Sequence, residues 1–252
     1  MDNALEFANK RVWVTGAGQG IGYTTALAFV KAGAEVVGFD KHFNEGDYPF
    51  RTEVLDVTDA KAAREVCQRL LAERDGLDVL VNGAGILRMG ATDELSDEDW
   101  HDCLAVNAGG AFNMFRHTLP VFRRQKRGAI VSIASNAAHV PRIGMSAYCA
   151  SKAALRSLCL SVGLEMAPFG VRCNLVSPGS TDTPMQRGMW TSPESEQLTI
   201  AGFPEQFKLG IPLGKIGKPQ DVAEAVLFMA SDRAGHITMQ DIVIDGGATL
   251  AA

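Results

Sequence analysis

The fold is decided by a short apolar run and the glycine-rich turn that follows it, Val12-Trp13-Val14-Thr15-Gly16-Ala17-Gly18-Gln19-Gly20-Ile21-Gly22. Residues 21–32 continue with helical spacing and end at Gly33, a typical helix stop. The glycines fit Gly-x-x-x-Gly-x-Gly, because Ile21 stands where Gly-x-Gly-x-x-Gly requires its last glycine. A strand, a turn and a helix in this order predict an α/β fold with the helix N-terminus beside the turn.

The turn is predicted to hold the pyrophosphate of a dinucleotide, because glycine permits φ > 0 and lets the backbone approach a phosphate closely. Asp40 ends the next apolar run, and its carboxylate can accept both hydroxyls of the adenosine ribose. It would repel a 2′-phosphate, so NAD is favoured over NADP although Lys41 is adjacent. Asp40 could otherwise be an ordinary turn residue. The residues expected at this site are Gly16, Gly18, Gln19, Gly20, Ile21, Gly22 and Asp40.

The bulk composition argues against several classes of protein. The chain has 252 residues and a net charge of −5, which lacks the basic balance of a nucleic-acid-binding protein. Five cysteines without a CxxC pair favour neither a disulfide framework nor a metal site, and they fit a reducing cytosol. Residues 1–6 are unlike a signal peptide, and no apolar run is long enough to span a bilayer. We therefore expect a cytoplasmic protein that binds neither nucleic acid nor membrane.

Apolar runs typical of strands alternate with alanine-rich amphipathic stretches. Strands are predicted at residues 12–14, 35–39, 53–57, 77–81, 129–133, 172–176 and 242–244. Helices are predicted at residues 21–32 and 59–73, from residue 97 onward, through Asn107 to about residue 124, and at residues 146–167 and 219–229, with Asp59 and Ser96 as N-caps. Apolar strands separated by helices imply a parallel sheet covered on both faces. The sequence thus predicts one Rossmann-like, doubly wound α/β domain over residues 1–252, with a seven-stranded parallel sheet.

Residues 180–214 differ from the rest of the chain. They carry four prolines and little periodicity, and they follow the carboxyl end of a predicted strand. Ligands bind beyond such strand ends in open α/β sheets, so this stretch is interpreted as a substrate lid. An irregular surface excursion is the alternative.

Tyr148 and Lys152 lie four residues apart, and Ser135 lies thirteen residues before the tyrosine. Residues four apart share one face of a helix, so the lysine can place its charge near the tyrosine ring. A free tyrosine has a pKa of about 10, and a nearby cation favours the phenolate that can accept a proton from an alcohol. Ser135 can donate a hydrogen bond to the substrate oxygen. The pair could also be a helix tyrosine with an unrelated surface lysine, but the glycine turn and the serine favour chemistry beside a dinucleotide.

With these features the chain resembles the short-chain dehydrogenase/reductase family over essentially its whole length. The matching residues are Thr15, Gly16, Gly20, Ile21, Gly22, Asp56, Asn82 to Gly85, Asn107, Ser135, Tyr148, Lys152, Pro178 and Gly179. The resemblance implies that Tyr148 is the general base and that Lys152 binds the nicotinamide ribose and lowers the tyrosine pKa. It further implies that Ser135 orients the substrate and that Asn107 holds a water molecule in a proton relay. The further cofactor contacts that it implies are Asp56, Val57, Asn82, Ala84, Gly85, Pro178, Gly179 and Thr183. Gly83 departs from the family, which often has asparagine or alanine there.

Further stretches, residues 85–93, 141–148, 180–187 and 205–216, resemble a branch of the family that oxidises a cyclic dihydrodiol acid. Arg88 and Arg142 are expected in loops at the carboxyl edge of the sheet, where an arginine fork suits a carboxylate. Either could instead be a surface residue, and Arg187 in the lid is a weaker third candidate. Methionines could supply a flat apolar pocket for a ring. The substrate residues expected are Arg88, Ser135, Arg142, Met145 and Tyr148.

Other functions stay open at this point. The protein could be another NAD-linked member of the family that acts on a different cyclic hydroxy acid, a sugar, a steroid or a 3-oxoacyl substrate. It could also be a silent NAD-binding regulator, although the intact catalytic set speaks against this. Residues 245–250 resemble a segment that family members use in packing, so a homotetramer is expected. Contact with other enzymes of its pathway is left open.

Overall fold

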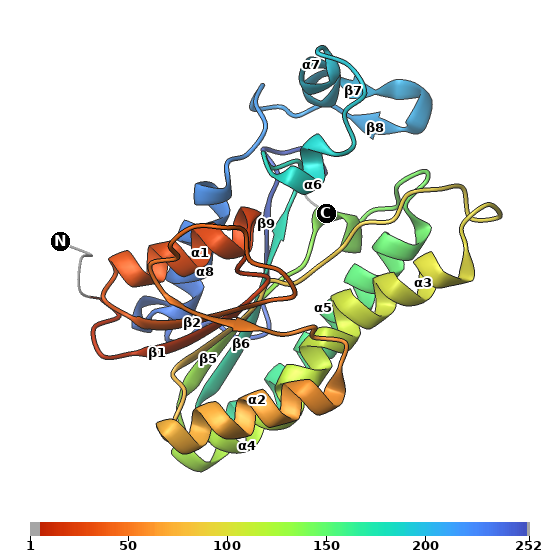
Figure 1. The fold of residues 1–252 in the computed structure, drawn as a ribbon. Coiled ribbons are helices and arrows are strands. Elements are labelled where there is room, and N and C mark those ends of the chain that lie inside the picture. The colour runs from red at the N-terminus through yellow and green to blue at the C-terminus, as the bar shows by residue number, and fades with distance from the viewer. Residues whose placement is uncertain (1–5, 251–252) are drawn as a thin grey trace.

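The computed structural model describes residues 6–250, and its centre is a seven-stranded sheet whose strands all run parallel (Figure 1). The strand order is β3-β2-β1-β4-β5-β6-β9, so the winding reverses between β1 and β4. In open α/β sheets the ligand site lies beyond the carboxyl ends of the strands at this reversal. The strands are β1 (Arg11–Thr15), β2 (Glu35–Asp40), β3 (Arg51–Val54), β4 (Val79–Asn82), β5 (Gly128–Ile133), β6 (Val171–Pro178) and β9 (Asp241–Ile244).

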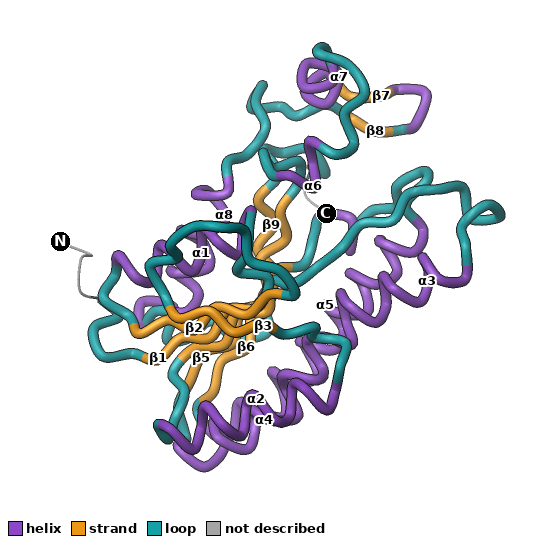
Figure 2. The backbone as a smooth tube through the Cα atoms, in the orientation of Figure 1, coloured by secondary structure: helices purple, strands orange, loops and turns teal. Residues whose placement is uncertain are grey.

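Helices cover both faces of the sheet (Figure 2). One face carries α1 (Gly20–Lys31) and α8 (Pro219–Ala230), and the other carries α2 (Ala60–Glu73), α4 (Gly110–Gln125) and α5 (Ser146–Met166). Successive residues of a strand point to opposite faces, so Val12 and Trp13 of β1 lie in two different apolar clusters. Both are fully buried, which explains why β1 is apolar throughout. The predicted doubly wound parallel sheet is confirmed.

The third strand is displaced from its predicted place. The prediction was residues 53–57, whereas β3 spans Arg51–Val54. The apolar residues Leu55 and Val57, which suggested a strand, are buried in the core beyond its end. The strand itself lies at the sheet edge and is mostly exposed, so its polar composition carries no strand-like apolar pattern.

The two helices predicted between residue 97 and about residue 124 are joined by a π-helical turn. They are α3 (Asp97–Leu104) and α4, and the turn spans Ala105–Gly109. Ser96 caps α3 by accepting a hydrogen bond from the Asp99 N–H at 3.0 Å, and Asp59 caps α2 in the same way, as predicted. A π-helical turn inside a helix often marks a functional position, and this one contains Asn107.

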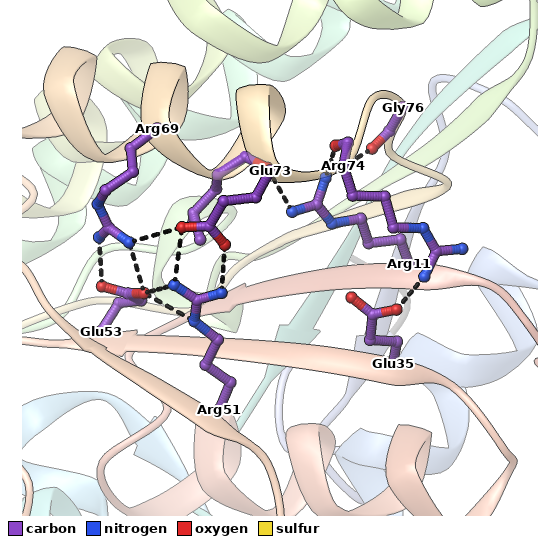
Figure 3. A network of polar contacts seen from close by, with 9 residues as sticks. Arg11, Glu35, Arg51, Glu53, Arg69, Glu73, Arg74 and Gly76 are labelled. Atoms are coloured by element: carbon purple, nitrogen blue, oxygen red, sulfur yellow. Dashed lines mark hydrogen bonds and ion pairs between the residues drawn. The ribbon is translucent and has the colours of Figure 1, made fainter.

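An ion-pair network ties the edge strand to α2 (Figure 3). Arg51 of β3 contacts Glu73 at 2.5 Å, and Arg69 of α2 contacts Glu53 of β3 at 2.6 Å. The side chains are partly exposed, so each pair adds little stability, but the crossed arrangement holds the strand against the helix. The network lies on the surface of the fold and contributes no side chain to the cleft described in the next section.

Residues 180–214, which we call the lid, contain several short elements. They are α6 (Pro184–Arg187), α7 (Ser195–Ala201) and an antiparallel hairpin of β7 (Gly202–Phe203) and β8 (Lys208–Leu209). Figure 1 shows them together beyond the carboxyl ends of β6 and β9. Within residues 6–250, no helix is both long and apolar enough to cross a membrane.

Candidate active site

A cleft of about 780 Å³ lies where the strands end. Its floor is made by the loops after β1, β2, β4, β5 and β6, and the lid forms one wall. A volume of this size is in the range of ligand sites. The lining residues that were expected from the sequence are Gly16, Gln19, Gly20, Ile21, Gly22, Asp40, Asp56, Val57, Ala84, Gly85, Arg88, Ser135, Arg142, Met145, Tyr148, Lys152, Pro178, Gly179 and Thr183.

The glycine turn is shaped by close backbone approaches. Gly16 has φ +73°, and a Cβ at Gly22 would lie 2.0 Å from the Gly16 carbonyl oxygen, so both positions require glycine. Gln19 is the N-cap of α1 but makes no side-chain capping hydrogen bond. The first N–H groups of α1 are therefore free of a side-chain cap and face the cleft, as a pyrophosphate site requires.

Asp40 ends β2 beside this turn. Its carboxylate accepts hydrogen bonds from the Gly18 N–H at 2.8 Å and the His42 N–H at 3.2 Å. Tyr48, which the sequence did not single out, donates its hydroxyl hydrogen to the Gly18 carbonyl at 3.0 Å. Gly18 does not line the cleft itself, and its part is to let Asp40 and Tyr48 fix the turn.

Next to Asp40 in the chain, Lys41 forms an ion pair with Asp56 at 3.0 Å, and both residues line the cleft. A hydrogen bond from the Thr58 hydroxyl, and then Lys41, lower the pKa of Asp56 below its usual value. Asp56 is therefore a carboxylate with defined partners, and it lines the cleft as expected.

The candidate catalytic residues Ser135, Tyr148 and Lys152 all line the cleft. Tyr148 and Lys152 lie one turn apart on α5, with the Lys152 Nζ atom 5.8 Å from the centroid of the Tyr148 ring. The Lys152 ammonium donates a hydrogen bond to the Ile133 carbonyl at 2.9 Å. Ser135 follows β5 in extended conformation, and its hydroxyl accepts a hydrogen bond from the Ala137 N–H at 3.1 Å.

Burial dominates the protonation of this group. It raises the pKa of Tyr148 to about 12, and a side-chain hydrogen bond with Ser135 opposes the rise. Burial also lowers the pKa of Lys152 to about 8. Lys152, which the sequence predicts to favour the phenolate, is not among the groups that act on the Tyr148 pKa in the protein without cofactor. The positive charge of an oxidised nicotinamide would supply the additional stabilisation of the phenolate.

Asn107 lies behind the cleft rather than in its wall. Its side chain accepts a hydrogen bond from the Ile86 N–H at 2.8 Å and donates one to the Ser151 hydroxyl at 2.8 Å. A Cβ at Gly85 would lie 3.2 Å from the Asn107 Oδ1 atom and 3.3 Å from the Lys152 Nζ atom. The side chains of Asn107 and Lys152 therefore both lie next to Gly85.

Asn82 is also absent from the cleft wall. Its amide donates a hydrogen bond to the Ser132 hydroxyl at 3.0 Å and so links β4 to β5 beneath the floor.

The three arginine candidates have different surroundings. Arg88 lines the cleft, but it pairs with Asp99 at 2.9 Å and Asp102 at 3.2 Å on α3. Arg187 is exposed and paired with Asp182 at 2.6 Å, outside the cleft wall. Arg142 lines the cleft, and among residues 6–250 its guanidinium has no ion-pair partner. Of the three, Arg142 is the one whose charge is available to a ligand.

Known proteins resemble the chain along almost all of its length. A family model described as enoyl-(acyl carrier protein) reductase matches residues 16–249. The 2,3-dihydro-2,3-dihydroxybenzoate dehydrogenase of Escherichia coli (strain K12) is 67% identical, and the match covers 98% of this chain and 100% of that protein. The enzyme of the same name from Bacillus subtilis (strain 168) is 42% identical, with 98% and 99% covered.

A solved structure agrees with the sequence matches. The ligand-free aldohexose dehydrogenase of Thermoplasma acidophilum has a TM-score of 0.88 at 32% identity, and the match covers 97% of this chain and 96% of that one. The glycine turn, the Tyr148/Lys152 pair and these matches all indicate the same family. The chain belongs to the short-chain dehydrogenase/reductase family.

Proposed function

We propose that the protein oxidises 2,3-dihydro-2,3-dihydroxybenzoate to 2,3-dihydroxybenzoate with NAD, a step in the biosynthesis of catecholate siderophores of the enterobactin type. The observation that carries the proposal is a single cleft in which an available cation, Arg142, lies beside the Ser135/Tyr148/Lys152 group. Arg142 can pair with the substrate carboxylate, and Tyr148 can accept the proton of the reacting hydroxyl. The 67% identity to the E. coli enzyme of that name supports the same substrate.

NAD suits the residues that the cleft presents. The uncapped start of α1 can bind the pyrophosphate, Asp40 the adenosine ribose, and Lys152 the nicotinamide ribose. Bound NAD supplies the hydride acceptor. Tyr148 accepts the proton of the substrate hydroxyl while Ser135 orients its oxygen and the hydride leaves the same carbon. The ketone that results then tautomerises to the aromatic catechol, which makes the oxidation effectively one-way.

The lid, the oligomeric state and the location belong to the same proposal. Residues 180–214 close the substrate side of the cleft as part of one domain, and the enzyme acts in the cytoplasm. The exposed apolar side chains Leu213 and Leu250 lie at or near the C-terminal segment, which supports assembly into a homotetramer. Analytical ultracentrifugation measures that state directly, and a monomer at micromolar concentration would contradict it.

The test of the function is NADH formation by the purified protein, offered the dihydrodiol acid with NAD⁺ and, separately, NADP⁺. We expect rapid NADH production, with catechol fluorescence appearing in step, and much slower reduction of NADP⁺. Intact NAD binding without turnover would discard this substrate, and other cyclic hydroxy acids, sugars and 3-oxoacyl compounds would be tried next.

A further inference from the structure

Lys208 has an unusual place in the lid. It is the first residue of β8, and it is half-buried between Phe207, which is 89% exposed, and Leu209, which is 57% exposed. A strand of a surface hairpin ordinarily buries its apolar residues and exposes its charged ones. Here the charged residue is the more buried one, and it lines the cleft. Covering an ammonium while leaving phenylalanine and leucine in water is costly unless the ammonium has a task in the cleft.

The hairpin holds this lysine in place. Phe203 of β7 pairs directly with Lys208 across the two strands, and the Lys208 Nζ atom lies 5.4 Å from the centroid of the Phe203 ring. A cation over an aromatic face is attracted to it, so the aromatic ring supports the side chain on the cleft side. Phe203 also lines the cleft.

Lys208 and Arg142 belong to different segments of the chain and line the same cleft. Arg142 belongs to the loop before α5, which the Gly144 carbonyl fixes by accepting a hydrogen bond from the Gly90 N–H at 3.0 Å. Burial lowers the pKa of Lys208 and, after burial, the positive charge of Arg142 lowers it further. The two cations line one cleft, and the charge of Arg142 acts on Lys208 there.

Neither cation is neutralised within residues 6–250. The Cys149 thiol and then the Asp245 carboxylate act on Arg142, but that carboxylate already accepts hydrogen bonds from the Thr249 hydroxyl at 2.6 Å and the Gly247 N–H at 2.9 Å. No carboxylate acts on Lys208. Two neighbouring cations in a partly buried cleft are stabilised by an anion between them.

We propose that Lys208 and Arg142 together bind the substrate carboxylate, with Arg142 fixed on the body of the protein and Lys208 supplied by the lid. The inference rests on the proposed function and adds Lys208, a residue of the lid, as a determinant of specificity for the carboxylate. The carboxylate joins the two walls, so binding the acid draws the β7–β8 hairpin toward α5. A ring without a carboxylate leaves the two cations repelling each other and lacks this closure.

Binding measurements test the inference separately from turnover. Calorimetry with NADH present compares 2,3-dihydroxybenzoate with catechol, which has the same ring and hydroxyls but no carboxylate. Wild type should bind the acid at least about tenfold more tightly, the effect of one charge-assisted hydrogen bond. Lys208→Met should lose most of this preference through weaker binding of the acid alone, and Lys208→Arg should retain most of it.

Two controls make the result specific. Lys215→Met removes an exposed lysine just beyond the lid and outside the cleft wall, and should leave both affinities unchanged. Combining Lys208→Met with Arg142→Met should give a loss that differs from the sum of the single losses, because both cations hold one anion. Thermal unfolding of each variant checks that the fold is intact.

The possible outcomes are distinct. Equal loss of the acid and of catechol in Lys208→Met, an unchanged affinity for the acid, or strict additivity would each overturn the shared binding of the carboxylate. Wild type that prefers the acid and loses this preference in Lys208→Met, yet forms no NADH with the dihydrodiol acid, would support the carboxylate site and overturn the proposed function instead.

Discussion

The Lys41 ammonium lies 3.0 Å from the Asp56 carboxylate, so the cation next to Asp40 already has a partner in the cleft. Its charge would otherwise favour the 2′-phosphate of NADP and counteract Asp40. Both side chains are at least partly exposed, so the pair orients the lysine more than it stabilises the fold. We therefore expect two carboxylates to act on cofactor preference, Asp40 by facing the ribose and Asp56 by holding the lysine.

Asp40→Ala should weaken NAD binding and lower the ratio of kcat/KM for NAD⁺ to that for NADP⁺ by about tenfold or more, since a charged hydrogen-bond acceptor is lost. Asp40→Asn is the matched comparison, because it keeps an acceptor for the Gly18 N–H and removes only the charge. It therefore measures the part of the effect that the negative charge contributes. Adding Asp56→Asn should lower the ratio again by releasing Lys41. A ratio that stays constant in all three variants would show that the ribose lies elsewhere.

Tyr148→Phe should abolish turnover while NAD still binds. The variant removes only the hydroxyl that accepts the substrate proton, and a positioned general base contributes about 10²- to 10⁴-fold to the rate. Steady-state NADH formation measures the loss, and calorimetry with NAD checks the cofactor site. Near-normal turnover would remove Tyr148 from the chemistry.

The sequence predicted the parts of the site that are local. The glycine turn, its strand and its helix are contiguous, and Tyr148 and Lys152 are one helical turn apart, so spacing alone placed them correctly. Asp59 and Ser96 were recognised as N-caps for the same reason. In each case the interacting groups lie within a few residues, where backbone geometry leaves few alternatives.

What the sequence did not predict depends on contacts between distant segments. Arg88 and Arg142 looked equivalent, but the docking of α3 gives Arg88 two acidic partners. The position of Lys208 in the cleft wall depends on a hairpin of two short strands, in a stretch without periodicity. The π-helical turn at Asn107 has no local sequence signal other than the glycine pair that ends it.

Lys152→Met should stabilise the protein without NAD at neutral pH. The pKa of Lys152 falls from 10.5 to about 8 on folding, so the charged lysine costs the folded wild type roughly 3 kcal/mol. The variant avoids this cost but loses the hydrogen bond to the Ile133 carbonyl, which reduces its advantage by about 1 kcal/mol. Between pH 8 and 10.5 the unfolded wild type binds more protons than the folded one, so its stability rises with pH.

Urea unfolding at pH 7 should therefore show Lys152→Met more stable by about 1–3 kcal/mol, with the advantage shrinking above pH 8 as the wild type gains stability. The same variant should lose activity, since it removes the nicotinamide ribose partner. A constant difference in unfolding free energy from pH 7 to 10.5 would mean that burial does not lower the pKa of Lys152.

Arg142→Gln should raise KM for the dihydrodiol acid by about tenfold or more, and by far more than it raises KM for NAD⁺, because its guanidinium is the available charge on the fixed wall of the cleft. Arg88→Gln is the matched comparison from the same cleft. Asp99 and Asp102 already neutralise Arg88, so the rise in KM for the acid should be clearly smaller. Initial rates with each substrate varied in turn separate the two effects. Equal rises for acid and NAD⁺ in Arg142→Gln would exclude it from the carboxylate site, and a larger rise in Arg88→Gln would assign the carboxylate to the arginine beside α3.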